Sequence, residues 1–182
     1  MSRIYPDDPS GPFEPPPLRF EDRSDRTAVV REFAESTDRE YEADREALVE
    51  MYAAFDSEDR AQGIPPTDEE RIREWLGHVL VDEAVNVVAE LDDDGIVGHA
   101  TLVPDGEEGY ELAIFVLGEY QNAGIGTRLM EGLLGAGQQQ GVEHVWLTVE
   151  RWNNPAIALY RKVGFEASST ESFELEMSIR LA

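Results

Sequence analysis

Residues 110–129 combine two features that suit a phosphorylated ligand. An apolar stretch typical of a buried strand leads through a turn with Gly124 and Gly126 directly into the apolar periodicity of a helix. The first N–H groups of a helix have no partner within it, and its dipole places positive charge at that end. Because glycine lacks a Cβ, an anion can approach this backbone closely. The stretch therefore predicts a cradle for a diphosphate.

Two common phosphate-binding motifs fit this stretch poorly. A P-loop requires Lys and then Ser or Thr after its second glycine, where this chain has Thr127 and Arg128. A dinucleotide-binding turn requires a third glycine at the position of Leu129. The glycines could also serve only to let the helix pack closely on the strand. The turn alone therefore does not identify the ligand.

A second stretch, about thirty residues later, predicts a short helix with clearly marked ends. Asn154 is expected to cap this helix, and Pro155 suits its first turn. The helix should run to about Lys162 and close at Gly164.

Together, the two stretches resemble the motifs of the GNAT superfamily of N-acetyltransferases. Gln121-Asn122-Ala123-Gly124-Ile125-Gly126 resembles the family signature Gln/Arg-x-x-Gly-x-Gly/Ala, and residues 154–165 resemble its second motif. The resemblance implies an α/β fold with a mixed, mostly antiparallel central sheet of about six or seven strands, flanked by about four helices. It also implies an acyltransferase that moves an acetyl group from acetyl-CoA to a primary amine of a small molecule or protein, by direct attack in a ternary complex.

The same resemblance implies which residues contact acetyl-CoA. Backbone groups of Val116, Leu117 and Gly118 would hold the pantetheine arm and polarise the thioester. Main-chain N–H groups of the turn would hold the diphosphate, and they belong to Gln121, Asn122, Ala123, Gly124, Ile125, Gly126 and Thr127. Asn154 would face the cofactor, although its position equally suits a simple helix cap. No metal is implied.

Two side chains are candidates for the chemistry. Tyr160 matches the tyrosine that in many family members protonates the leaving thiolate, although a core tyrosine would leave the same pattern. Glu111 lies where several members place the general base, acting directly or through a water, although a glutamate on a strand is usually only solvated. His78, His99 and His144 lack the spacing of metal ligands. Among them, His99 is the best further candidate, because its strand should neighbour that of Glu111.

The elements that must position these residues follow from periodicity and turn chemistry. Four helices are predicted. The first covers about 39–55, and the second follows a capping box formed by Thr67 and Glu70. The third covers about 124–140, and the fourth lies in the second motif. Strands are predicted over 85–91, 96–103, 110–117, 144–149 and 173–181, with a further strand or hairpin within 18–33. This order favours a mixed sheet with helices on its faces.

Composition limits the partners. The net charge of −24, from 39 acidic and 15 basic residues, repels nucleic acid and anionic membranes. Residues 118–165 are an exception, because equal numbers of acidic and basic side chains cancel there, so an anionic cofactor is repelled least by this segment.

The absence of cysteine excludes disulfides and a cysteine nucleophile. Neither a signal peptide nor an apolar run long enough to span a membrane is evident, so a cytoplasmic location is expected.

The basic residues are almost all arginine, since Lys162 is the single lysine. Arginine with many surface carboxylates favours the hypothesis of a halophilic protein, because molar salt shortens the Debye length to about 3 Å and screens self-repulsion. The alternative is a protein that is acidic without any adaptation to salt.

The chain is expected to contain a disordered, proline-rich tail over residues 1–17 and a single N-acetyltransferase domain over 18–182. Residues 57–67 should help to form the acceptor site. Family members often pair through sheet edges, so the resemblance allows a homodimer without fixing the oligomeric state. The alternative to an enzyme is a non-catalytic acyl-CoA-binding sensor or partner domain, in which Tyr160 and Glu111 would be idle. A module that binds nucleotide phosphates is a third interpretation.

Overall fold

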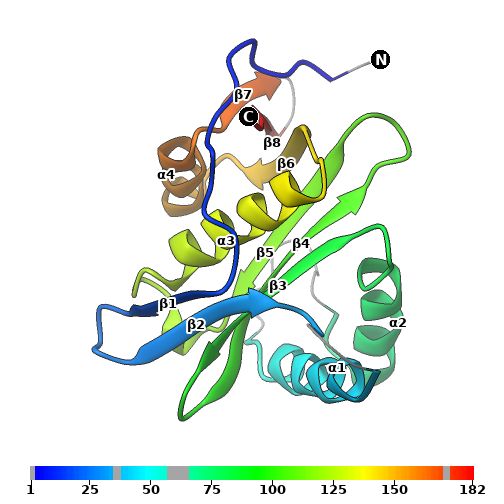
Figure 1. The fold of residues 1–182 in the computed structure, drawn as a ribbon, viewed down its shortest axis with the longest axis vertical. Helices are drawn as coiled ribbons and strands as arrows, with labels where there is room; N and C mark the ends of the chain where they lie inside the picture. The colour runs from blue at the N-terminus through cyan, green and yellow to red at the C-terminus, as the bar shows by residue number, and fades with distance from the viewer. Residues whose placement is uncertain (1–2, 35–37, 57–65, 170–172) are drawn as a thin grey trace.

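The computed structural model describes residues 3–34, 38–56, 66–169 and 173–182. In these ranges the chain forms one sheet of eight strands and four α-helices (Figure 1). The strands are β1 (Leu18–Glu21), β2 (Thr27–Glu32), β3 (Val85–Leu91), β4 (Gly95–Pro104), β5 (Tyr110–Val116), β6 (His144–Glu150), β7 (Glu166–Ser169) and β8 (Glu174–Arg180). The helices are α1 (Asp38–Ala53), α2 (Glu69–Val79), α3 (Ile125–Gln139) and α4 (Asn154–Val163).

The strands lie in the order β1-β2-β3-β4-β5-β6-β8-β7, and every neighbouring pair except β5 and β6 is antiparallel. The predicted mixed, mostly antiparallel sheet is therefore confirmed, with eight strands instead of six or seven. One strand that the prediction lacks is β7, whose short sequence Glu-Ala-Ser-Ser carries no apolar alternation. In the described residues, no helix has the length and hydrophobicity needed to cross a membrane.

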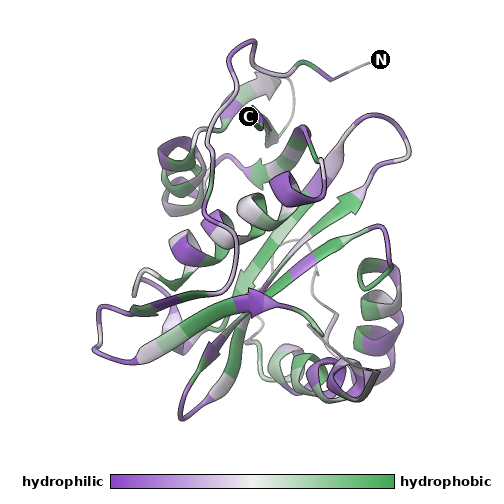
Figure 2. Cartoon of the chain, viewed as in Figure 1, coloured by the Kyte–Doolittle hydropathy of each residue, from purple (hydrophilic) through white to green (hydrophobic). Residues whose placement is uncertain are grey.

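Helices cover both faces of the sheet and create two cores. On one face, Ala100 and Leu102 of β4 share a core with Leu129 and Leu133 of α3. On the other face, α1 and α2 enclose a second core that contains Tyr52. Figure 2 shows hydrophobic residues along the central strands and hydrophilic residues at the β1–β2 and β3–β4 turns. This double burial explains why the central strands read as nearly continuous apolar runs.

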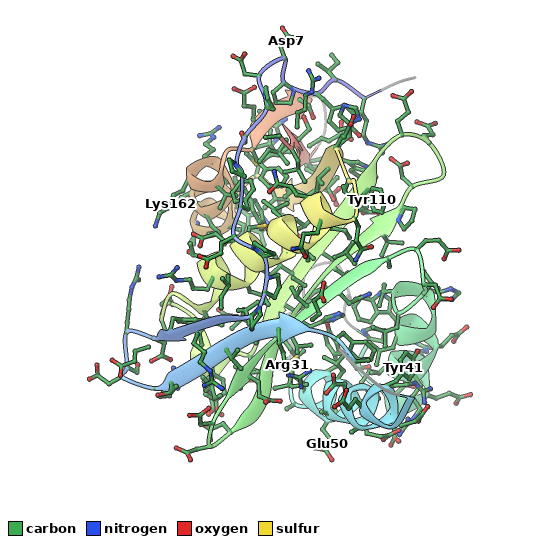
Figure 3. The ribbon with its side chains drawn as sticks, in the orientation of Figure 1. Asp7, Arg31, Tyr41, Glu50, Tyr110 and Lys162 are labelled. Carbon is green, nitrogen blue, oxygen red and sulfur yellow. The ribbon has the colours of Figure 1, made fainter. Side chains whose placement is uncertain are left out.

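An ion-pair network fastens α1 to the sheet. Arg31 of β2 (Figure 3) donates two hydrogen bonds of 2.8 Å to the carboxylate of Asp44 in α1. The same guanidinium donates to Glu90 of β3 at 2.9 Å, and the N–H of Ala34 donates to Asp44 at 2.9 Å. These contacts hold the pKa of Asp44 below its usual range against the opposing effect of its burial. The position of α1 over the sheet is thereby fixed.

Helix α2 begins one residue later than the predicted capping box. Asp68, not Thr67, is its N-cap, and the Asp68 carboxylate accepts a 3.0 Å hydrogen bond from the Arg71 N–H. An aspartate at this position satisfies an N–H of the first turn and also favours the positive end of the helix dipole.

Residues 3–17 lie against the domain in an extended path across α3 (Figure 1), whereas the sequence predicts a disordered tail. Arg3 pairs with Glu176 at 2.8 Å, and the Phe13 N–H donates to Gln138 Oε1 at 2.7 Å. Ser10 forms a bridge with Leu181 at the end of the sheet. The prolines in this segment restrict its backbone, which reduces the entropy lost when it is held in place.

Two glycines of α3 let other parts of the backbone approach the helix closely. A Cβ added to Gly135 would lie 2.5 Å from the carbonyl oxygen of Glu14 and 2.8 Å from the Cα of Pro15. A Cβ on Gly132 would lie 2.7 Å from Val30 of β2. Gly135 and Gly132 therefore serve packing of the N-terminal segment and of β2, respectively.

A chain of polar side chains crosses the second core. The buried Tyr52 hydroxyl lies 2.6 Å from His99 Nδ1, and His99 Nε2 lies 2.8 Å from Asn86 Oδ1. The Asn86 amide donates to the carbonyl of Val79 at 2.9 Å, so its oxygen faces the imidazole and accepts from Nε2–H. Complete burial lowers the pKa of His99 to about 3. His99 is therefore a neutral core residue with both ring nitrogens in use.

Replacing Gly135 by alanine should destabilise the protein by about 1–3 kcal/mol, because the methyl group has no room beside Glu14 and Pro15. Gly77 in α2 is the matched control, since a Cβ there meets nothing within 4 Å. Gly77→Ala should stabilise by about 0.5–1 kcal/mol through helix propensity alone. Urea unfolding of both variants measures the difference. Equal stabilisation by both substitutions would show that the N-terminal segment does not pack on α3.

Acid should destabilise the wild type partly through His99. An unfolded histidine binds a proton below about pH 6.5, whereas the folded state keeps His99 neutral down to about pH 3. The unfolded state then binds more protons, so stability falls as the pH drops below 6.5, by about 2 kcal/mol at pH 5. His99→Gln should remove this component. Urea unfolding at pH 7.5 and pH 5 tests it, and the same pH dependence in both proteins would contradict a neutral buried imidazole.

Candidate active site

A cavity of about 620 Å³ opens where β5 and β6 part. The two strands pair in parallel only at Tyr110 with Val145 and at Glu111 with Trp146. Beyond this point β5 stays paired with β4, and β6 stays paired with β8. Among the described residues, the facing edges of β5 and β6 therefore have no strand partner along the cavity, so their backbone N–H and C=O groups can bind an extended ligand. Ligands of open α/β sheets typically lie at such a point, beyond the carboxyl ends of parallel strands.

The turn that joins β5 to α3 forms one end of the cavity. A short 3₁₀ segment, Gly118–Tyr120, follows β5, and Gln121 Nε2 donates back to the carbonyl of Val116 at 2.9 Å. Asn122 has φ of 60°, and Gly124, the N-cap of α3, has φ of 91°. The first turn of α3 contains no acidic residue. The N–H groups at this helix end therefore lie beside the cavity without a competing carboxylate in the first turn of α3.

The two glycines of this turn do not serve close packing. A Cβ on Gly124 would meet nothing within 4 Å, and a Cβ on Gly126 would make an ordinary 3.7 Å contact with Leu159. Gly124 is required by its positive φ, which residues with a Cβ rarely adopt. The open space at both positions is what an anion needs to reach the backbone.

The cavity brings together about half of the predicted cofactor-binding residues. It is lined by Val116, Gln121, Asn122, Gly124, Gly126 and Thr127. Four others do not line it, namely Leu117, Gly118, Ala123 and Ile125. Ile125 is fully buried in the core, and the N–H of Leu117 donates to the carbonyl of Val97 at 3.0 Å. These two residues hold the turn against the core and the sheet.

The asparagine of the second motif that reaches the cavity is Asn153. Its side chain accepts from the Ala156 N–H at 3.4 Å, which makes Asn153 the N-cap of α4 and places Asn154 in the first turn. Asn153 and Pro155 line the cavity, whereas Asn154 is exposed and does not. The predicted cap is thus displaced by one residue.

Tyr160 of α4 lies in the wall of the same cavity. Its side chain is buried, and burial raises the pKa of its hydroxyl to about 12. In the described residues the hydroxyl makes no hydrogen bond. Tyr160 therefore keeps its proton at neutral pH and has it available for a ligand.

Glu111 lines the cavity at its base, on the last residue of β5 that still pairs with β6. The residue is exposed, yet the surrounding protein removes part of its hydration and raises its pKa, an effect to which Asp105 and Glu174 add. Arg3 acts in the opposite direction. Glu111 is therefore a better proton acceptor than an ordinary glutamate.

The three histidines lie apart from this chemistry. His78 and His144 do not line the cavity, and both ring nitrogens of His99 are engaged in the core. In register, His99 lies opposite Phe115, and Glu111 lies opposite Val103.

The structure adds cavity residues that the sequence patterns do not indicate. Arg23 comes from the β1–β2 turn, Phe55 follows α1, and Glu174 begins β8. Lys162 of α4 (Figure 3) and Thr127 line both this cavity and a hollow of about 270 Å³ that Pro12, Phe13 and Glu14 help to enclose. Of these, Thr127 was predicted as part of the cradle turn, and Lys162 stands out in the sequence only as the single lysine.

Known proteins match both the sequence and the fold. Residues 45–165 match the Acetyltransferase (GNAT) family. An N-alpha-acetyltransferase of Sulfurisphaera tokodaii is 34% identical over 108 residues, which cover 50% of this chain and 62% of that protein.

Two solved structures have the same fold. One is the ribosomal-protein-alanine N-acetyltransferase of Brucella melitensis, with 26% identity, a TM-score of 0.63 and coverage of 84% of this chain and 99% of that one. The other is yncA of Salmonella typhimurium, solved with its cofactor acetyl-CoA, with 19% identity, a TM-score of 0.64 and coverage of 85% of this chain and 94% of that one.

The match to the curated relative spans less than two thirds of that relative's length, so its specific activity does not transfer with it. The family match is broader, because it takes in more than half of this chain and includes the cradle turn and the second motif. On this ground the protein belongs to the GNAT family of acetyltransferases.

Proposed function

We propose that the protein transfers an acetyl group from acetyl-CoA to an amine, by direct attack of the amine on the thioester in a ternary complex. The observation that carries this proposal is the single cavity that joins the amino end of α3, Tyr160 and Glu111. Donor binding and proton transfer can therefore take place in one continuous space.

The cavity suits the parts of acetyl-CoA. The diphosphate would lie against the N–H groups at the start of α3, next to Gly124 and Gly126. The pantetheine arm contains amides, and the open edge of β5 offers N–H and C=O groups to bind them, as an added strand would. Leu147, Val149 and Leu159 supply apolar surface for the rest of the arm.

Tyr160 and Glu111 would move the protons. The departing CoA thiolate must be protonated. Because thiols ordinarily have a pKa near 8.5, CoA is already a fair leaving group, and the proton of the neutral Tyr160 hydroxyl need assist its departure only modestly. The attacking amine must lose a proton, which Glu111 would accept directly or through a water. Backbone N–H groups of β5 at the open edge would polarise the thioester carbonyl.

The acceptor that we propose first is the α-amino group of a polypeptide. The similar proteins from S. tokodaii and B. melitensis are named as an N-alpha-acetyltransferase and a ribosomal-protein-alanine N-acetyltransferase. Glu111, Glu150 and Glu174 line the cavity and would attract a cationic segment. Residues 57–65, most of the segment expected to shape the acceptor site, lie outside the described residues.

Thiol release from acetyl-CoA in the presence of a panel of amines tests the proposal. The panel should contain peptides with free and blocked N-termini, a polyamine and free lysine. Release that requires a free N-terminus would support the polypeptide acceptor, and release with another amine would replace it. CoA binding without release for any amine would favour the alternative, a domain that binds acyl-CoA without catalysis.

Tyr160→Phe should lower kcat by about 10²–10⁴-fold if proton transfer limits the rate, while the Kd for CoA changes little. Tyr110→Phe is the matched control, because Tyr110 lies on β5 but does not line the cavity. Steady-state kinetics and calorimetric titration together separate chemistry from binding. A Tyr160→Phe variant with unchanged kcat would remove Tyr160 from the proposed role.

The activity of the wild type should fall as the pH drops through the pKa of Glu111, because only the ionised carboxylate accepts a proton. This pKa lies above its usual range, and one cause is Glu174. Glu174→Gln should therefore move the acidic limb of the kcat/KM profile to lower pH, whereas Glu111→Gln should lower kcat and abolish the limb. A limb that stays in place in both variants would assign it to another group.

A further inference from the structure

One guanidinium in the cavity wall comes from a part of the chain that precedes the family match. Arg23 lies in the turn between β1 and β2, and the match begins at residue 45. Arg23 lines the cavity together with Asn122, Gly124, Gly126 and Thr127 of the cradle turn. A cation from the N-terminal hairpin thus lies beside the anion-binding end of α3.

The hairpin is fastened directly to the cradle turn. The backbone N–H of Arg23 donates to the carbonyl of Ala123 at 2.9 Å, and Arg23 Nη1 donates to the carbonyl of Asn122 at 3.4 Å. The guanidinium of Arg26 lies over the ring of Tyr120, 4.6 Å from its centre. These contacts place the Arg23 side chain across the turn.

The shape of the hairpin turn is itself fixed by a buried carboxylate. Asp22, only 5% exposed, accepts from the N–H groups of Ser24 at 2.9 Å and Arg26 at 3.0 Å. The same carboxylate pairs with Arg26 Nε at 2.7 Å. Three donors lower the pKa of Asp22 although burial opposes this. Arg23 is therefore held on a rigid support, and Arg26 is neutralised by Asp22.

The guanidinium of Arg23 is not paired with a carboxylate of the described residues, and most of its N–H donors are unused there. In the described part of the chain it forms no ion pair with a carboxylate, although the net charge of the protein is −24. Its one side-chain hydrogen bond uses one of five guanidinium N–H groups. A planar guanidinium matches two oxygens of a phosphate, so the remaining donors suit a diphosphate.

We infer that Arg23 binds the diphosphate of CoA, and that the β1–β2 turn is a second wall of the cradle. The inference rests on the proposed use of acetyl-CoA as the acetyl donor. The backbone of α3 would contact the diphosphate from one side and the guanidinium from the other. The β1–β2 hairpin would thereby offset the repulsion between an acidic protein and a polyanionic cofactor.

Titration calorimetry with CoA at fixed ionic strength, without an acceptor, tests this role through binding alone. Arg23→Gln should weaken CoA binding about tenfold, or about 1.4 kcal/mol. Arg19→Gln is the control, because this substitution removes the same charge from the same hairpin. Arg19 is exposed on β1 and does not line the cavity. Arg23→Lys, which keeps the charge but loses the fork, should fall between Arg23→Gln and the wild type. Equal losses in Arg23→Gln and Arg19→Gln would overturn the inference.

Dephospho-CoA, which lacks the 3′-phosphate, identifies the phosphate that is bound. The factor lost in Arg23→Gln should be the same for CoA and dephospho-CoA if the diphosphate is the partner. A loss that disappears with dephospho-CoA would move the contact to the 3′-phosphate and overturn the assignment. Thermal unfolding of Arg23→Gln without ligand should match that of Arg19→Gln, and a lower Tm would assign Arg23 a structural role instead.

The proposed function can fail separately. A wild type that binds CoA but acetylates no amine would leave the role of Arg23 standing. A wild type that does not bind CoA would contradict both.

Discussion

The site depends on one constraint, which is that β5 and β6 can pair for only two residues. Each strand is committed on its other side to a longer antiparallel partner, β5 to β4 and β6 to β8, and the two halves of the sheet then diverge. The gap exposes backbone groups that a continuous sheet would have used. Because α3 follows β5 directly, its positive end faces the same gap, and α4 closes the other side. This geometry leaves backbone N–H and C=O groups that an extended, strand-like ligand with a phosphorylated end can satisfy.

The same divergence places two ionisable groups in different surroundings. Tyr160 lies deep in the cavity wall, where loss of hydration holds its proton. Glu111 lies at the base of the gap, where partial loss of hydration raises its pKa and neighbouring carboxylates add to this effect. His99 shows the contrast on the other face of the sheet. Its imidazole is buried like the Tyr160 side chain, but its two ring nitrogens are hydrogen-bonded to the Tyr52 hydroxyl and the Asn86 side-chain oxygen. His99 therefore stabilises the core, and neither ring nitrogen is available for proton transfer to a ligand.

The sequence predicts the features that depend on neighbouring residues. It does not predict those that depend on contacts between distant parts of the chain. The cradle and the alternation of β8 are local, so periodicity and turn chemistry find them. Whether Asn153 or Asn154 caps α4 depends on which side chain reaches the Ala156 N–H, and two adjacent asparagines leave that open. Arg23 lies about a hundred residues from the turn that it supports, and no spacing rule connects them. The contacts of residues 3–17 escape prediction for the same reason, because they are made by single anchors and not by an apolar pattern.

Helix α3 shows how these distant contacts matter for the cradle. Its sequence contains four glycines, Gly126, Gly132, Gly135 and Gly137, each of which costs about 0.5–1 kcal/mol relative to alanine in a helix interior. Such a helix would be weak alone, so its position must come from what packs on it. Gly132 and Gly135 admit β2 and residues 3–17, respectively, and the β1–β2 hairpin also holds the turn at the helix start through Ala123. The N–H groups that would bind a diphosphate are thus oriented by residues that precede the family motifs, so the structure of the cradle turn depends on packing by the N-terminal residues.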